Sequence, residues 1–150
     1  MIQSRRIDPL LRRAQEHEDS VARDLAERQR TLAQHESRLE ELRQYAEDYA
    51  NSQMAATSPA QLANRRAFLE RIAQALKQQL QNVARSRASV DIERDRLLLA
   101  SRDKQVLEQL AASYRVQERQ IVDRRDQREM DDLGARRARL AAAARESEDA

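Results

Sequence analysis

The sequence predicts an all-α fold: a long antiparallel hairpin of two helices that wind around each other as a coiled coil. Three observations lead to this prediction. Charged residues make up 36% of the chain and aromatic residues 3%, with one Gly and two Pro, which suits long helices with narrow apolar seams. Apolar residues recur at alternating steps of three and four in two long stretches. A single cluster of weak helix formers separates the two stretches.

The first helix is expected over about residues 9–50. Asp8 can cap its N-terminus, and Pro9 suits the first helical position, where its missing N–H costs nothing. Two interleaved apolar series follow with a mean spacing of 3.5 residues, which predicts a seam that packs on a partner helix. The members of this seam are Ile7, Leu11, Ala14, Val21, Leu25, Leu32, Leu39, Leu42, Ala46 and Tyr49, with Glu18, Arg28 and His35 as polar interruptions. At such a seam position, His35 is expected to set the register of the two helices.

The tip of the hairpin is expected at about residues 51–58, in the stretch ANSQMAATSPAQL. A capping box is predicted at Ser58, Pro59 and Gln61. In it the Ser58 side chain caps the next helix, and the Gln61 side chain binds the main-chain N–H of Ser58. The second helix is therefore expected over about residues 59–140. Its predicted seam is Leu62, Leu69, Ala73, Leu76, Leu80, Val83, Val90, Leu97, Leu107, Leu110, Tyr114 and Ile121, with Arg66, Arg87 and Arg94 interrupting it.

A short break between two such helices predicts antiparallel packing within one coiled-coil domain over residues 1–150. With the tip near residue 55, Tyr49 is expected beside Leu62. The first helix then covers the second only as far as about residue 102. The chain from about residue 103 is expected to overhang without a partner in the hairpin.

The few aromatic residues gather around the tip. Tyr45, Tyr49 and Phe68 flank it, and only Tyr114 lies elsewhere. Phe68, Ile72, Ala75 and Gln79 recur at steps of four, three and four, so they share a helix face. This stripe is expected beside the seam and partly exposed. It has two interpretations, a widened seam that stiffens the hairpin end and a patch that binds a partner.

Several classes of function receive no support from the sequence. The chain has no cysteine, two histidines and one glycine, and therefore offers no thiolate metal site or glycine-rich phosphate loop. We expect no catalytic residue, cofactor or metal, because two packed helices form no concave, partly dry site. Acidic residues are interleaved with the basic ones, which argues against nucleic-acid binding. No apolar run reaches the length of a transmembrane segment, and the N-terminus lacks a signal-peptide core, which predicts a cytoplasmic protein.

The chain resembles the FliJ family of the flagellar type III export apparatus. The stretches LEELRQYAEDY, RRAFLERIAQALKQQ and RRDQREMDDLGARR carry the resemblance. It implies a non-enzymatic antiparallel coiled coil similar to the central stalk of rotary ATPases. It also implies three kinds of partner: the export ATPase FliI, the export gate protein FlhA and export chaperones. The gate-binding patch implied is Leu42, Tyr45, Tyr49, Phe68, Ile72 and Ala75.

The ATPase contact is expected at the end of the hairpin that holds both helix termini, where charged side chains can meet pore-lining loops. The residues assigned to it are Arg5, Arg6, Arg12, Arg13, Gln127, Asp131, Arg136, Arg137 and Arg139. The resemblance implies a monomer that associates peripherally with the inner membrane at the flagellar base. Two alternatives stay open: a coiled-coil spacer or self-associating scaffold, and the equivalent stalk of a virulence secretion system.

Overall fold

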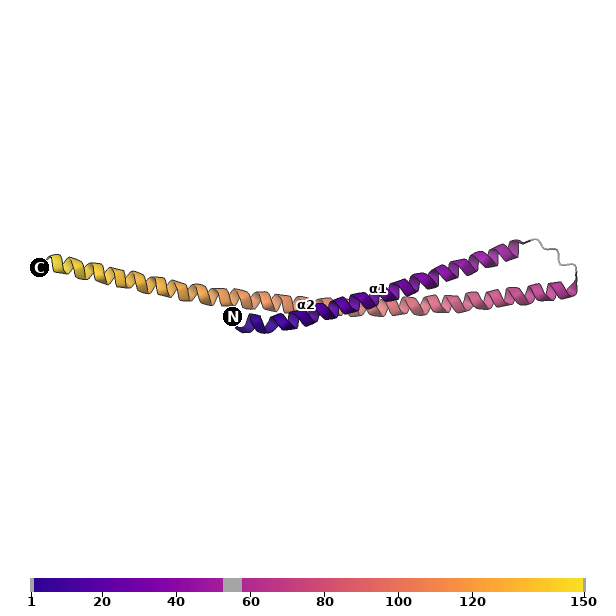
Figure 1. Cartoon of the computed structure of the whole chain (residues 1–150), viewed down its shortest axis with the longest axis horizontal. Helices are drawn as coiled ribbons and strands as arrows, with labels where there is room; N and C mark the ends of the chain where they lie inside the picture. The colour runs from indigo at the N-terminus through magenta and orange to yellow at the C-terminus, as the bar shows by residue number, and fades with distance from the viewer. Residues whose placement is uncertain (1, 53–57, 150) are drawn as a thin grey trace. The chain divides into compact units, whose positions relative to one another are not determined.

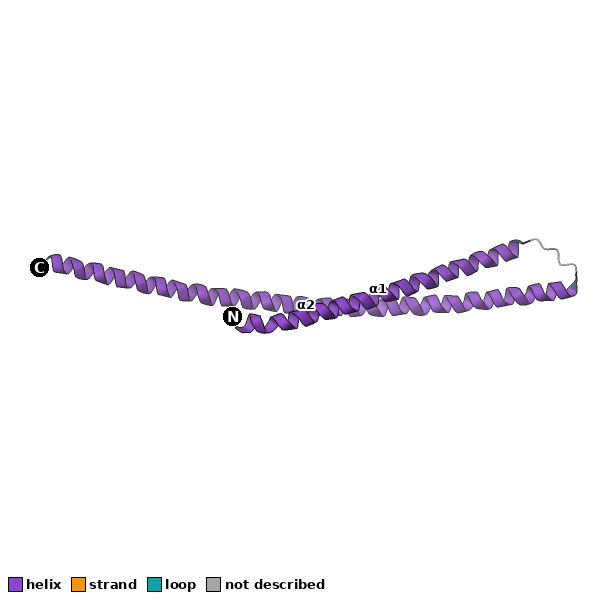
Figure 2. Ribbon diagram, in the orientation of Figure 1, coloured by secondary structure: helices purple, strands orange, loops and turns teal. Residues whose placement is uncertain are grey.

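A computed structural model describes residues 2–52 and 58–149 of the chain. These residues form two helices, α1 (Ile2–Asn51) and α2 (Pro59–Glu148), without a strand among them (Figures 1 and 2). The two helices pack against each other, which confirms the predicted all-α hairpin. The contacts divide the chain into two units where the sequence predicted one domain. Unit 1 comprises residues 1–13 and 104–150, and unit 2 comprises residues 14–103.

Helix α1 begins at Ile2, seven residues earlier than the sequence predicts, and holds Pro9 inside it. An internal proline removes one backbone hydrogen bond and crowds the preceding turn, which disfavours such an extension. Contacts of the first two turns with α2 offset this cost. Ile7 is buried, and both Ser4 and Asp8 bind side chains of α2. Asp8 therefore pairs with a distant arginine and does not cap the helix.

The N-terminus of α2 forms as predicted. The Ser58 hydroxyl accepts a hydrogen bond from the main-chain N–H of Gln61 at 3.3 Å, and the Ser58 carbonyl accepts one from Leu62 at 3.2 Å. Pro59 is the first helical residue, where no N–H is needed. At the other side of the connection, Ser52 N–H and Oγ both bond to the Tyr49 carbonyl, which ends α1.

The C-terminus of α2 lies at Glu148, beyond the predicted end near residue 140. Ala141 to Ala144 are strong helix formers, and Arg145 in the last turn interacts favourably with the carbonyl end of the helix dipole. Gly134 does not interrupt the helix, and its φ is negative.

Replacing Gly134 with alanine is expected to stabilise this part of α2. A Cβ built at Gly134 meets no atom within 4 Å. Glycine is less favourable than alanine in a helix interior by about 0.5–1 kcal/mol. We therefore expect amide hydrogen exchange around residue 134 to slow by about two- to fivefold in the Gly134→Ala variant. Faster exchange there would show that the position needs the freedom of glycine.

The core of unit 2 is a single seam between α1 and α2. On α1, Val21 and Leu39 are buried, and Leu25, Leu32, Leu42 and Ala46 are half-buried, as predicted. On α2, the buried residues recur at steps of three, four and seven: Ile72, Gln79, Val83, Ser86, Val90, Glu93 and Ala100. Burial of aliphatic side chains supplies most of the stabilisation of such a seam.

The predicted phase of the α2 seam is wrong near the tip. Leu62, Leu69 and Leu80 are exposed, whereas Ile72 and Gln79, expected beside the seam, are 7% exposed. The arginines expected to interrupt the seam are exposed too, and Gln79, Ser86 and Glu93 are its polar members. A helix with 3.6 residues per turn drifts by about 20° per heptad from a strict seven-residue repeat. Between Val83 and Leu62 this drift turns the stripe of Leu69 and Leu62 away from α1 and brings the stripe of Ile72 and Phe68 into the seam.

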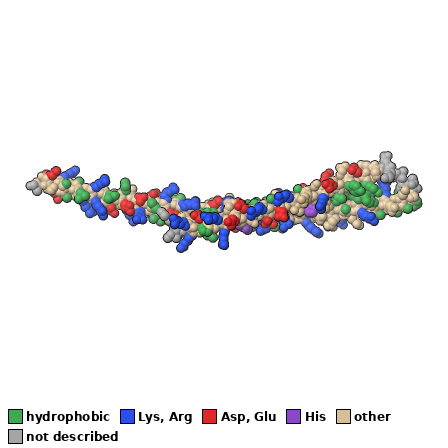
Figure 3. Space-filling model, viewed as in Figure 1, with side chains coloured by type: hydrophobic (Ala, Val, Ile, Leu, Met, Phe, Trp, Pro, Cys, Tyr) green, Lys and Arg blue, Asp and Glu red, His purple; other side chains and the backbone are tan. Residues whose placement is uncertain are grey.

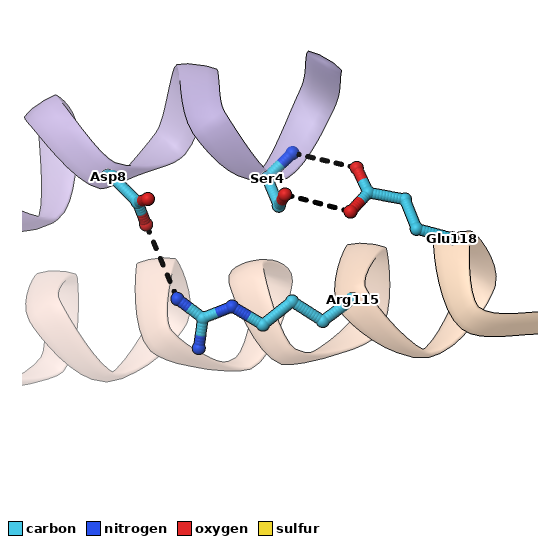
Figure 4. Close-up of polar contacts among 4 residues, drawn as sticks. All are labelled: Ser4, Asp8, Arg115 and Glu118. Carbon is cyan, nitrogen blue, oxygen red and sulfur yellow. Dashed lines mark hydrogen bonds and ion pairs between the residues drawn. The ribbon is translucent and has the colours of Figure 1, made fainter. Parts of the chain in front are cut away.

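Unit 1 joins the start of α1 to the middle of α2. Ile7 and Ala111 are buried there. Glu118 accepts hydrogen bonds from Ser4 N–H at 3.1 Å and Ser4 Oγ at 2.8 Å, and Arg115 pairs with Asp8 at 3.3 Å (Figure 4). The amino terminus has the largest effect on the pKa of Glu118 and, together with these Ser4 hydrogen bonds, lowers it to about 2 against the opposing effect of desolvation. Glu118 is therefore ionised near neutral pH, as acceptance of both bonds requires.

The unpartnered part of α2 is shorter than predicted. Residues 104–118 pack on residues 4–11 of α1, whereas the sequence predicted an overhang from about residue 103. Two differences explain this: α1 starts earlier, and Asp8 lies opposite Arg115, well beyond residue 102. From residue 119 to residue 149, every residue is exposed. We call residues 119–148 the C-terminal segment.

Candidate protein-binding surfaces

Three aromatic rings form one cluster in unit 2. The ring centroids of Tyr49 and Phe68 lie 4.5 Å apart with a tilt of 50°, and those of Tyr45 and Phe68 lie 6.2 Å apart edge to face. Both geometries are favourable for aromatic pairs. The sequence placed Tyr49 beside Leu62, whereas the structure places its ring against Phe68. Figure 3 shows apolar side chains gathered on the visible face of α1 and α2 towards their connection.

The residues of the predicted gate-binding patch are less exposed in the structure than the sequence predicted. Tyr45 is 53% exposed and Ala75 is exposed, so both are available to a partner. Leu42, Tyr49 and Phe68 are half-buried. Ile72 is buried in the seam, so the expectation that it is exposed is wrong. The cluster thus widens the seam and also presents an exposed tyrosine, and the binding patch stays a prediction.

Polar contacts fix the register of the seam next to this cluster. The Gln79 side-chain N–H₂ donates to the main-chain carbonyl of His35 at 2.9 Å and lies 3.2 Å from Nδ1 of the His35 ring. Asn82 donates in turn to the Gln79 amide oxygen at 3.2 Å. On the surface nearby, Arg87 pairs with Glu36 at 3.3 Å. A polar seam residue with a specific partner sets the register at some cost in stability, as the sequence predicted for His35.

The residues assigned to the ATPase contact are all exposed but do not meet at one place. Arg5, Arg6, Arg12 and Arg13 lie on the part of α1 that packs beside residues 104–118. Arg136 is 18 residues beyond Glu118, about 27 Å further along the helix at 1.5 Å per residue. The expected joining of the two arginine groups is therefore wrong. Gln127 donates a hydrogen bond to Asp131 at 3.2 Å, so these two lie on one side of the C-terminal segment.

The C-terminal segment also carries apolar side chains that sequence reasoning missed. Met130, Leu133 and Leu140 are 68%, 55% and 71% exposed. At 100° per residue they fall within an arc of about 80°, and Arg137 lies among them. Arg124, Arg128 and Arg139 occupy the other side of the helix, and Arg136 lies about 40° from Leu140 at the edge of the apolar arc. The spacing of three and seven residues was the available signal, and the surrounding arginines obscured it.

Two other kinds of site find no support in the described part of the chain. No helix there combines the length and the apolar composition that a membrane crossing requires. Among residues 2–52 and 58–149, no three His, Cys, Asp or Glu side chains are grouped so that they could hold a metal ion.

Comparison with known proteins agrees with the resemblance seen in the sequence. A protein-family model described as FliJ, flagellar FliJ protein, matches residues 3–143. Neither a curated protein nor a solved structure matches the chain. The match covers both helices, including the aromatic cluster and most of the C-terminal segment.

Proposed function

The chain belongs to the FliJ family, a component of the flagellar protein export apparatus, and from this premise we propose that it links the export ATPase FliI to the export gate protein FlhA. In this role the chain binds and positions other proteins. It also assists the handling of export chaperones and their substrates. It works in the cytoplasm and associates peripherally with the inner membrane through the gate. It is a monomer when free.

The gate is proposed to bind the aromatic cluster of unit 2. Tyr45 supports this assignment, because a half-exposed ring backed by Phe68 is held in place before a partner arrives. Tyrosines of this kind are frequent among the side chains that dominate binding energy. Ala75 and the accessible parts of Leu42 and Phe68 complete the contact. Ile72 supports the patch from below without touching the gate.

The ATPase is proposed to bind the C-terminal segment. Its thirty residues carry an apolar stripe and many charged side chains of both signs, and no other described residue covers them. An isolated helix gains little stability in water from its own hydrogen bonds, so insertion into the central pore of an ATPase ring supplies the missing packing. Met130, Leu133 and Leu140 fill apolar space there, and Arg136, Arg137 and Arg139 meet the pore-lining loops. Arg5, Arg6, Arg12 and Arg13 form a separate contact at the mouth of the ring.

Binding of the purified chain to each partner separately tests this function. The cytoplasmic domain of FlhA and the ATPase FliI are each titrated with the full chain by calorimetry. We expect saturable binding to both, together with a rise in the rate of ATP hydrolysis by FliI. Absence of binding to both partners would refute the linking role.

A further inference from the structure

A second apolar surface lies on the outside of α2 in unit 2. Leu62, Leu69 and Leu80 are 56%, 37% and 48% exposed, and exposed Ala73 lies between them. Their spacings of seven, four and seven residues keep all four on one side of the helix. We call these four residues the leucine stripe. Its heptad spacing is the pattern with which one helix packs on another.

Helix α1 does not cover the leucine stripe. Phe68 and Ile72 are the side chains of α2 that turn towards α1, and Leu69 is rotated by about 100° from Phe68. A shallow groove runs over the start of the stripe and is lined by α2 alone. Its apolar lining consists of Pro59, Leu62, Ala63, Ala67 and Leu69, and its charged lining consists of Arg65, Arg66 and Glu70.

The surroundings of the leucine stripe are basic. Arg66 lies between Leu62 and Leu69 in the spacing of the stripe, and Lys77 lies four residues after Ala73 and three before Leu80. Within residues 59–85, Arg65, Arg66 and Lys77 lie within about 60° of the stripe at 100° per residue, and the one acidic residue, Glu70, lies about 80° from it. Arg71 and Arg85 lie on the other side of the helix. A helix that packs here therefore gains from carboxylates beside its own apolar stripe.

A second copy of the chain does not meet this requirement. Pairing one stripe with another brings the two basic segments together, which costs free energy through like-charge repulsion. The acidic part of α1, residues 36–48, has its carboxylates on the outside but turns its leucines into the seam. It offers no free apolar stripe to a second molecule.

We propose that the leucine stripe binds an acidic amphipathic α-helix of another protein. The helix places apolar residues at heptad spacing on Leu62, Leu69, Ala73 and Leu80. Its carboxylates pair with Arg66 and Lys77. This site is distinct from the aromatic cluster, because Tyr45 contacts Phe68 on another side of α2. The assignment does not depend on the proposed function, so a chain that binds neither FlhA nor FliI retains it.

Titration of the full chain with a designed peptide tests the site. The probe is a synthetic three-heptad helix with Leu at positions a and d and Glu at e and g, and its control carries Lys in place of each Glu. We expect the acidic peptide to bind and the basic peptide to bind at least about tenfold more weakly. Leu69→Ser and Leu80→Ser should each weaken binding of the acidic peptide by about tenfold, a change of about 1.4 kcal/mol.

Leu99→Ser is the matched control variant, since Leu99 is 58% exposed and lies outside the stripe. It should bind the acidic peptide like the unaltered chain, and all three variants should melt alike because the side chains are exposed. Three outcomes would overturn the proposal: no binding of the acidic peptide, equal binding of the basic peptide, or equal weakening by Leu99→Ser. Binding to phosphatidylglycerol vesicles without binding to the acidic peptide would replace it with a membrane contact.

Discussion

Replacing Tyr45 with alanine is expected to weaken binding to the cytoplasmic domain of FlhA by about thirtyfold, with little change in melting temperature. Tyr45 is 53% exposed, so its loss removes little buried area from the folded chain. An aromatic side chain that dominates an interface contributes about 2 kcal/mol or more, which corresponds to that factor. Calorimetric titration gives the affinity, and circular dichroism gives the melting curve. Swimming motility should fall in parallel.

Two matched variants separate binding from folding at this patch. Tyr45→Phe keeps the ring against Phe68 and should bind nearly as well as tyrosine. Phe68→Ala should lower the free energy of unfolding by about 2–3 kcal/mol, because the ring is half-buried and contacts two others. If Tyr45→Ala melts far below the unaltered chain, or binds the gate normally, the aromatic cluster serves the hairpin alone.

Replacing Met130, Leu133 and Leu140 together with serine is expected to abolish most of the stimulation of FliI. All three are exposed, so neither the packing of unit 1 nor the seam of unit 2 should change. Loss of three apolar contacts at a pore should raise the concentration for half-maximal stimulation by about a hundredfold, which corresponds to about 2.8 kcal/mol. The measurement is the rate of ATP hydrolysis at increasing concentrations of the chain.

Charge reversal tests the same segment independently. Arg136→Glu, Arg137→Glu and Arg139→Glu in one chain should weaken stimulation more at low salt than at high salt, since screening reduces the contribution of exposed charges. Val106→Ser is a control, because Val106 is 63% exposed but lies outside the C-terminal segment. If neither the triple serine variant nor the triple glutamate variant changes the stimulation of FliI, the C-terminal segment does not contact the ATPase.

Periodicity predicted the fold because little else in this chain could organise it. One break between two stretches of heptads leaves an antiparallel hairpin as the simplest packing, and the Ser58 cap depends only on local sequence. The early start of α1 could not be predicted, because it rests on Ser4 and Asp8 binding side chains more than a hundred residues away. Those contacts outweigh the local preference of Pro9 for a helix start.

Of the candidate surfaces, only the aromatic cluster could be predicted from the sequence, because aromatic residues are rare in this chain. Three of the four aromatic residues lie near the one break, and this grouping indicated the cluster. The indication did not depend on which α2 residues were assigned to the seam. Leu69 and Ile72 could not be distinguished as exposed and buried, since both apolar stripes fit heptad spacing and only the drift of a straight helix chooses between them. The apolar side of the C-terminal segment was missed because arginines surround Met130, Leu133 and Leu140 in the sequence and obscure their spacing.

A sequential binding measurement tests the linking role most directly. The cytoplasmic domain of FlhA is immobilised, loaded with the chain and then exposed to FliI, while biolayer interferometry records each step. We expect FliI to add to the gate-bound chain and not to the gate alone. Tyr45→Ala should lose both steps, and the Met130, Leu133 and Leu140 variant should lose only the second. Displacement of the chain from the gate by FliI would contradict a link, because the two partners would then compete for one surface.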